Sequence, residues 1–366
     1  MPFRSTPADP QSLGRRLVSA ALTPRAIARV EDRTWEVTER FAARLRGRAG
    51  VIDLLAEFAT PVSATALGQI LGVPPKDADE RRFRELAARA TRAVRPILSD
   101  KQRRRMEQAS VEIAEYVRHL TEERRSSPKQ DLISDLLGAA RREDPGHLDD
   151  VVRVVAGLVS AGTGTTAVAF ARGLRALLQH PDQLALLRRE RELLPNAVNE
   201  LLRYDSGLLV MPRYAVERFE FRDRTIEAGQ LVALSIMGAN RDPRVFPDPD
   251  RLDLRRDTRE SLSFGYGPHY CIGANIARLE LRCMIAAALD FLPLQARLLE
   301  HEIRWSSRGM MSQLKSLPID FGGAIARDRP ALTRDLGTRR DGAPKTDRCS
   351  RPSTKERIAR RQDRGG

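Results

Sequence analysis

The amino-acid sequence predicts a mainly α-helical protein that carries small β-sheets. From about residue 12 to residue 205, apolar residues recur at spacings of three and four, and prolines such as Pro61 and Pro181 mark the breaks between helices. Between about residues 208 and 236 the pattern changes to short, partly alternating runs separated by turns. A chain of 366 residues with 41% hydrophobic residues can bury one large core.

The remaining elements follow in order along the second half of the chain. Residues 239–256 are rich in Pro and Asp and predict a loop, and a glycine-rich turn comes after it. A helix is expected from about residue 275 to residue 291, and two last strands near residues 301–306 and 314–321. Because no repeat or linker divides residues 1–323, we expect one domain there.

The last part of the chain, residues 324–366, differs in composition from the rest. It carries thirteen Arg or Lys and six Asp or Glu, which is half of the net charge of +14, and its three prolines interrupt any apolar pattern. These features predict a basic disordered tail. A basic tail can contact nucleic-acid phosphates. Because no aromatic residue lies between the arginines to stack on bases, we favour a solvated appendage and expect no nucleic-acid partner.

The cysteines and the apolar runs indicate the compartment. Cys271, Cys283 and Cys349 have no regular spacing, which argues against a disulfide scaffold or a structural zinc site and for a reducing, cytoplasmic location. The first residues contain no apolar signal region. The longest uncharged run, residues 154–171, is interrupted by Ser, Gly and Thr, so we expect no membrane anchor.

The most unusual segment is "SFGYGPHYCIGANIARLE", residues 263–280. Gly265, Gly267 and Gly273 allow a positive φ and can bring backbone N–H groups near the sulfur of Cys271. Cys271 also comes just before a predicted helix, whose N-terminal dipole favours an anion. The segment therefore predicts a thiolate that acts as a soft metal ligand.

One thiolate is too few ligands for a zinc or iron–sulfur site. It is enough for haem iron, because the porphyrin provides four further ligands, and small glycines would let a flat macrocycle approach. The alternative is a buried cysteine that acts as a small hydrophobe beside a phosphate-binding glycine loop. The residues alone leave both interpretations open.

The turn resembles the haem loop of the cytochrome P450 family. The family pattern of Phe, two residues, Gly, three residues, Cys, one residue and Gly is matched by Phe264, Gly267, Cys271 and Gly273. The resemblance implies an N-terminally truncated cytochrome P450 fold, haem b as the cofactor and Cys271 as the proximal iron ligand, with Phe264 packed beside it. It also implies that His269 is a basic partner of a haem propionate.

The run "LVSAGTGTTAVAF", residues 158–170, predicts a buried helix whose Gly and Thr residues serve ordinary helix packing. It is also similar to the family's oxygen-activation helix, with Ala161, Gly162 and Thr165 in the matching positions. The resemblance implies that the threonine helps to deliver protons. The family usually has an acid before that threonine, whereas this chain has Gly164, so a relay would run through water or neighbouring hydroxyls.

Further arginines match structural and propionate-binding positions of the family. Glu200 and Arg203 share a helical face at i and i+3, which on a surface would contribute little. The resemblance implies a network completed by Arg251 that holds the loop beneath the haem. Arg213, otherwise an exposed strand charge, and Arg15 match propionate-binding arginines, although Gln11 stands where the family has a histidine.

The apolar side chains expected to line the substrate pocket are Leu208, Leu209, Val210, Met211, Met310 and Met311. Such residues are equally typical of a plain core.

These features together imply a haem-thiolate monooxygenase. It would insert one oxygen atom of O2 into an apolar small molecule, with two electrons from ferredoxin and ferredoxin reductase docking near Arg278 and Arg282. The resemblance begins at about Asp9, and family members carry a further segment before this point that includes the roof of the substrate cavity. The alternative is therefore a catalytically inactive remnant with weak or no haem binding.

Overall fold

The computed structural model describes residues 10–22, 24–91, 100–143, 148–205, 207–306 and 311–323. The predicted tail, residues 324–366, lies outside them. The α-helices are α1 Pro10–Ala21, α2 Pro24–Ala42, α3 Thr60–Leu71, α4 Asp77–Thr91, α5 Asp100–Ser126, α6 Leu132–Glu143, α7 Leu148–Gln179, α8 Pro181–Arg189, α9 Leu194–Asp205, α10 Ile236–Ala239 and α11 Ala274–Phe291. A π-helical turn, η1, spans Leu55–Ala59, and the 3-10 turns are η2 Arg191–Leu193, η3 Gly267–His269 and η4 Glu300–Glu302.

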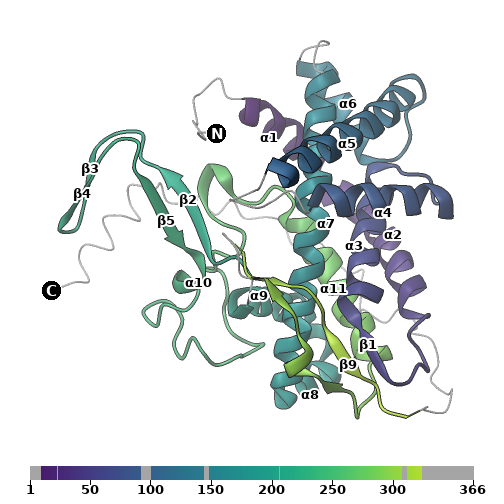
Figure 1. Ribbon diagram of the computed structural model, residues 1–366, viewed down its shortest axis with the longest axis vertical. Coiled ribbons are helices and arrows are strands. Elements are labelled where there is room, and N and C mark those ends of the chain that lie inside the picture. Colours follow the sequence, from purple (N-terminus) through teal and green to yellow (C-terminus); the bar gives the residue numbers. More distant parts are fainter. Residues whose placement is uncertain are drawn as a thin grey trace, which may run out of the picture. The chain divides into compact units, whose positions relative to one another are not determined.

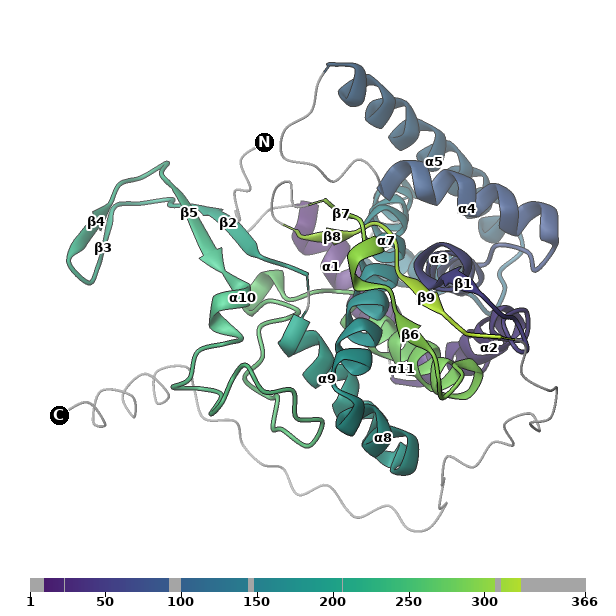
Figure 2. The ribbon, with the colours of Figure 1, turned by 60° about the horizontal axis from the view of Figure 1, so that its bottom comes forward.

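The strands are short and form small antiparallel sheets. They are β1 Val51–Asp53, β2 Val210–Tyr214, β3 Phe219–Phe221, β4 Arg224–Ile226, β5 Leu231–Ser235, β6 Arg297–Leu298, β7 Trp305–Ser306, β8 Gln313–Leu314 and β9 Pro318–Asp320. One sheet has the order β1-β9-β6, and the pairs β2-β5, β3-β4 and β7-β8 form the others. The pair β2-β5 projects from the helices and continues into β3-β4 (Figure 2).

Helix α7 is the central element of the helical part (Figure 1). It packs against α3, α4, α5, α9 and α11, because its apolar residues recur on almost every side. Val155 and Val159 are completely buried in its first half, and Phe170 and Leu174 in its second half. By length and composition Asp149–Gln179 is also apolar enough to cross a membrane, a test that the core helix of a soluble protein passes as well.

Two hydrophobic clusters meet along α7. The first contains Phe170 of α7, Phe58 of η1 and Phe291 of α11, and the ring of Phe58 lies edge-on to the other two at centroid distances of 5.4 and 5.0 Å. The second joins Val155 and Val159 to apolar residues of α1, α3, α4, α5 and α6. The core is therefore divided into two clusters, and α7 contributes residues to both.

The end of α3 shows why the sequence needs a glycine there. Gly72 caps the helix in the left-handed region at φ +105°, and its N–H bonds to the carbonyls of Gln69 and Gly68. A Cβ at this position would lie 2.3 Å from Oδ2 of the buried Asp131, so a side chain is excluded for two reasons.

The predicted elements are largely observed. The helix expected at residues 275–291 is α11, and the short runs between residues 208 and 236 form β2 to β5. The strand expected at residues 314–321 is divided into β8 and β9. The division arises because Leu317 bonds to the segment at β1 through the carboxylate of Asp53, at 2.9 Å, and the N–H of Leu54, at 3.0 Å.

We expect Phe58→Ala to lower the free energy of unfolding by about 3–5 kcal/mol, because the completely buried ring leaves a cavity between Phe170 and Phe291. Phe221→Ala is the matched control, since this ring is 59% exposed, and its effect should stay within about 0.5 kcal/mol. Urea unfolding followed by circular dichroism measures both. Equal losses for the two variants would contradict the assignment of Phe58 to the core.

Candidate functional site

The cysteine loop, residues 264–273, is held in shape by its own backbone. The N–H of Cys271 donates to the carbonyl of Phe264 at 2.8 Å, and the N–H of Tyr270 donates to the carbonyl of Gly267 at 3.0 Å. Gly265 and Gly267 have φ values of +77° and +70°, in the left-handed region where a Cβ would be strained. The glycines predicted to shape the turn therefore do so at these two positions.

The sulfur of Cys271 lies at the start of α11. Burial raises the pKa of this thiol above its ordinary value, although part of the residue is accessible to solvent. The backbone N–H of Gly273 and the positive charges of Arg278 and Arg15 act in the opposite direction without reversing the shift. A metal cation bound to the sulfur would supply the remaining stabilisation of the thiolate.

The space beside the loop suits a flat group. Residues 266–271 are all exposed, and a Cβ added at Gly267 or Gly273 would meet no heavy atom within 4 Å. Ile272 of the loop and Leu158 of α7 pack against the same hydrophobic cluster, so the loop and this helix share one part of the core. An accessible cysteine with open space at its two neighbouring glycines fits a thiolate-bound haem.

Cys283 lies on α11 and has a different environment from Cys271. It is completely buried, and burial raises the pKa of its thiol well above the ordinary value. Cys271 is thus the accessible thiol of the two cysteines that the structure describes.

The middle of α7 exposes the residues that the sequence singled out. Ala161 and Thr165 are accessible although the helix is largely buried, and the hydroxyl of Thr165 donates to the carbonyl of Ala161 at 2.6 Å. The group next to Gly162 is Leu67 of α3, because a Cβ added at Gly162 would lie 3.0 Å from Cδ2 of Leu67. The glycine therefore allows close packing of α3 on α7.

Helix α1 connects α7 to the cysteine loop. Arg15 donates through Nη2 to the carbonyl of Tyr270 at 2.7 Å. Gly14 faces α7, where an added Cβ would lie 2.9 Å from Cγ2 of Val154. Arg15 thus lies beside the cysteine loop, and its propionate-binding role stays a prediction, whereas the side chain of Gln11 lies outside the described residues.

The other two predicted propionate partners lie in different elements. His269 ends η3 within the cysteine loop and is exposed. Arg213 lies on β2, opposite Val232 of β5, and donates to the carbonyl of Pro212 at 2.9 Å. Within the described part of the chain, no hydrogen bond or ion pair joins Arg213 to the cysteine loop.

The two arginines expected at a docking surface make internal contacts. The guanidinium of Arg278 lies 4.4 Å from the ring centroid of Phe264 and donates to Asn199 at 2.9 Å. Arg282 forms an ion pair with Glu31 of α2. Arg278 thereby helps to fix the cysteine loop, and Arg282 joins α11 to α2.

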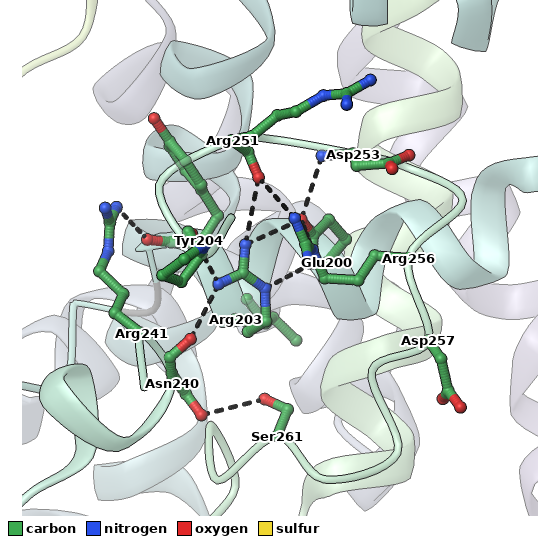
Figure 3. Close-up of polar contacts among 12 residues, drawn as sticks. Glu200, Arg203, Tyr204, Asn240, Arg241, Arg251, Asp253, Arg256, Asp257 and Ser261 are labelled. Carbon is green, nitrogen blue, oxygen red and sulfur yellow. Dashed lines mark hydrogen bonds and ion pairs between the residues drawn. The ribbon is translucent and has the colours of Figure 1, made fainter. Parts of the chain in front are cut away.

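Glu200 and Arg203 form a completely buried ion pair on α9 (Figure 3). Arg203 donates to both carboxylate oxygens of Glu200, at 2.6 and 2.9 Å. Its Nη1 also donates to the carbonyls of Asn240 and Pro249, at 2.8 and 3.0 Å. The pair therefore holds α9 against the loop that precedes the cysteine loop, as a bidentate arginine can do.

The third member of this network is Arg256, and the prediction of Arg251 is wrong. Arg256 donates through Nε to Glu200 Oε1 at 3.2 Å, and its side chain is 10% exposed. Arg251 contributes only its carbonyl, which accepts from Nη2 of Arg203 and of Arg256, while its guanidinium points away (Figure 3). The loop turns between Asp248 and Arg251, and this turn directs a backbone oxygen toward the pair.

Sequence reasoning missed two buried polar residues near the site. Asn240 is completely buried, accepts from the N–H of Leu262 at 2.7 Å and donates to Ser263 at 3.0 Å, so it anchors the start of the cysteine loop. Glu280 is 2% exposed on α11. The signal for Glu280 was available, because it shares a helical face with the apolar residues Ile276 and Met284.

Comparison with known proteins gives relatives over most of the chain. A sequence model described as Cytochrome P450 matches residues 11–296. Cytochrome P450 CYP107DY1 of Priestia megaterium is 33% identical over 307 residues, which cover 84% of this chain and 73% of that protein. The 6-deoxyerythronolide B hydroxylase of Saccharopolyspora erythraea is 32% identical over 312 residues, which cover 84% of this chain and 75% of that protein.

Solved structures agree with this result. CalO2 is similar with a TM-score of 0.78 at 32% identity, covering 87% of this chain and 79% of its own. Cytochrome P450 CYP109Q5 from Chondromyces apiculatus gives a TM-score of 0.76 at 31% identity, covering 86% of this chain and 78% of its own.

A cysteine loop of this form, in a chain whose core helix carries an accessible threonine, is typical of a haem-dependent oxidoreductase. The chain belongs to the cytochrome P450 family. It has the fold of that family, its cofactor is haem b, and its class of reaction is that of a monooxygenase. The alternative of an inactive remnant has no support from these relatives.

We expect Glu200→Gln to lower the free energy of unfolding by about 3–5 kcal/mol, because it leaves Arg203 buried without its counter-charge. Arg251→Ala is the control and should change stability by no more than about 0.5 kcal/mol, since its carbonyl stays in place. Chemical denaturation of both variants gives the comparison. If Arg251→Ala lowered the free energy of unfolding as much as Glu200→Gln, the side chain of Arg251 would belong to the network.

Proposed function

We propose that this protein hydroxylates an apolar small molecule with Cys271 as the thiolate ligand of haem b. The observation that carries the proposal is the accessible Cys271 in a closed loop with open space at Gly267 and Gly273. Arg15 and His269, with Arg213 on β2, are the residues that would bind the propionates. When bound, haem b supplies the activation of O2 and the transfer of one oxygen atom to the substrate.

Thr165 is the residue that we assign to proton handling. Its hydroxyl is accessible and can accept a hydrogen bond while it donates to Ala161. The neighbouring hydroxyls of Thr163 and Thr166 are buried and donate to the carbonyls of Val159 and Gly162, at 3.3 and 2.9 Å. Because Gly164 carries no acid, a proton would reach Thr165 through water.

The substrate is proposed to contact the start of β2 and the residues just before it. Leu208, Leu209 and Met211 are half-buried, and a β-bridge joins Leu208 to Met311. Met310, expected in the same pocket, lies outside the described residues. An apolar lining of this kind favours an apolar molecule. Relatives include a polyketide biosynthesis cytochrome P450, PksS of Bacillus subtilis, and the 6-deoxyerythronolide B hydroxylase.

Two electrons per turnover must come from a partner, and we propose ferredoxin and ferredoxin reductase in the cytoplasm. Arg278 and Arg282 would act there by fixing α11 and the cysteine loop, since their charges are engaged within the chain. Reconstitution with a purified ferredoxin and its reductase tests this part. Turnover supported by a reductase alone, with no ferredoxin present, would overturn it.

The decisive experiment is the spectrum of the reduced, carbon monoxide-bound protein. We expect a red-shifted, thiolate-type Soret band in the wild type and its loss in Cys271→Ser, because a serine hydroxyl does not replace the thiolate. Cys283→Ser is the matched control and should keep the band, since this cysteine is buried in α11. A wild type that takes up no stoichiometric haem would contradict the proposed function.

The role of Thr165 is tested by the ratio of product formed to electrons consumed. We expect Thr165→Val to lower this ratio by about tenfold or more, because a proton-handling hydroxyl is removed. Thr166→Val is the control, since its hydroxyl is buried and donates to a helix carbonyl. Equal ratios in the two variants would assign both threonines to helix packing alone.

A further inference from the structure

A buried carboxyl group contacts the centre of α7 through a serine. Glu280 of α11 is 2% exposed, and its Oε2 lies 2.9 Å from the hydroxyl of Ser63 on α3. The same hydroxyl lies 3.0 Å from the carbonyl oxygen of Thr163 on α7. These three helices pack against one another in the interior (Figures 1 and 2).

The number of hydrogens on each group determines which group donates in the two hydrogen bonds of Ser63. A serine hydroxyl has one hydrogen to donate and two lone pairs that accept, whereas a carbonyl oxygen only accepts. Ser63 therefore satisfies both contacts at full strength only if it donates to Thr163 and accepts from Glu280. A carboxyl group donates only when it is protonated. The geometry thus favours the neutral acid.

The surroundings of Glu280 agree with this arrangement. Burial raises the pKa of its carboxyl to about 8, and Ser63 opposes that shift only in part. Helix α3 contains no charged residue, and α7 contains none between residues 154 and 171.

Two ion pairs involve the other helices that pack against α11. On the side of α2, Glu31 pairs with Arg282, and on the side of α9, Glu200 pairs with Arg203. On α11 itself, Arg278 bonds to Asn199 and Tyr270, and burial keeps the Cys283 thiol from ionising by raising its pKa. None of these groups contributes a charge that shifts the carboxyl of Glu280.

We propose that Glu280 is a protonated carboxylic acid at neutral pH and a positioning residue that holds the Thr163 carbonyl of α7 through Ser63. Ionisation of Glu280 reverses the direction of the bonds. A carboxylate only accepts, so Ser63 turns its single proton toward Glu280 and releases Thr163, two residues from Thr165. The state of Glu280 thereby sets the geometry of the α7 segment that carries Gly164 and Thr165.

Infrared spectroscopy of the complete protein tests the protonation state of Glu280 and does not depend on catalytic turnover. We expect a carbonyl band of a protonated carboxylic acid at neutral pH, shifted in D2O and lost as the pH rises through about 8. The band should be absent in Glu280→Gln, shifted in Ser63→Ala and unchanged in Glu31→Gln, the matched control on α2. A wild type without such a band, or a band unaffected by Ser63→Ala, would overturn the proposal.

The pH dependence of stability is a second test that needs no haem chemistry. Because the pKa of Glu280 is raised on folding, the folded protein binds one more proton between about pH 4.5 and about pH 8. The stability of the wild type relative to Glu280→Gln should therefore fall as the pH rises through this range and then level off. A difference that stays constant with pH would mean that Glu280 is ionised in the folded state.

The positioning role itself rests on the proposed function and has its own readout. We expect the product-to-electron ratio of the wild type to fall as the pH rises through about 8, and this step to be absent in Glu280→Gln. The same step in both proteins would overturn the positioning role. A protein without oxygenase activity would overturn the proposed function instead, and the infrared and stability results would still decide the state of Glu280.

Discussion

The structure depends on how α7 is packed. This helix must be covered by α3 and α11, yet leave Ala161 and Thr165 accessible for chemistry. Because Gly162 has no side chain, Leu67 of α3 can pack closely against it, and the hydroxyl of Ser63 on α3 donates to the carbonyl of Thr163 nearby. Close packing on one side and access on the other are therefore properties of the same two helical turns.

A second constraint on the cysteine loop is the buried polar network at α9. The buried pair Glu200 and Arg203 binds backbone carbonyls of the loop after α10, and Asn240 extends this contact to the segment before Phe264. Charges that are removed from water need every partner, so the network has few alternative arrangements. It fixes the entry to the cysteine loop, while Arg278 and Arg15 hold the loop itself.

The sequence predicted the helices, the small sheets and the cysteine loop because these have local causes: periodic apolar residues, glycines with positive φ and a motif of fixed spacing. It did not predict that Arg256 replaces Arg251, because a turn decides which side chain of a loop points inward. The sequence also did not predict the contact of Glu280 with Ser63, since the two residues lie 217 positions apart in the chain. Local patterns carry no information about such distant pairs.

The contrast between the two described cysteines has a practical consequence. Alkylating reagents attack thiolates that they can reach, so the buried, hard-to-ionise Cys283 stays unreactive for as long as α11 remains packed. The pKa of the Cys271 thiol is raised as well, but this residue is exposed to solvent, so reagents reach it until its sulfur binds a metal. In a protein whose Cys349 has been replaced, labelling by iodoacetamide would thus count the molecules that lack cofactor, and slow labelling of Cys283 would count those that unfold.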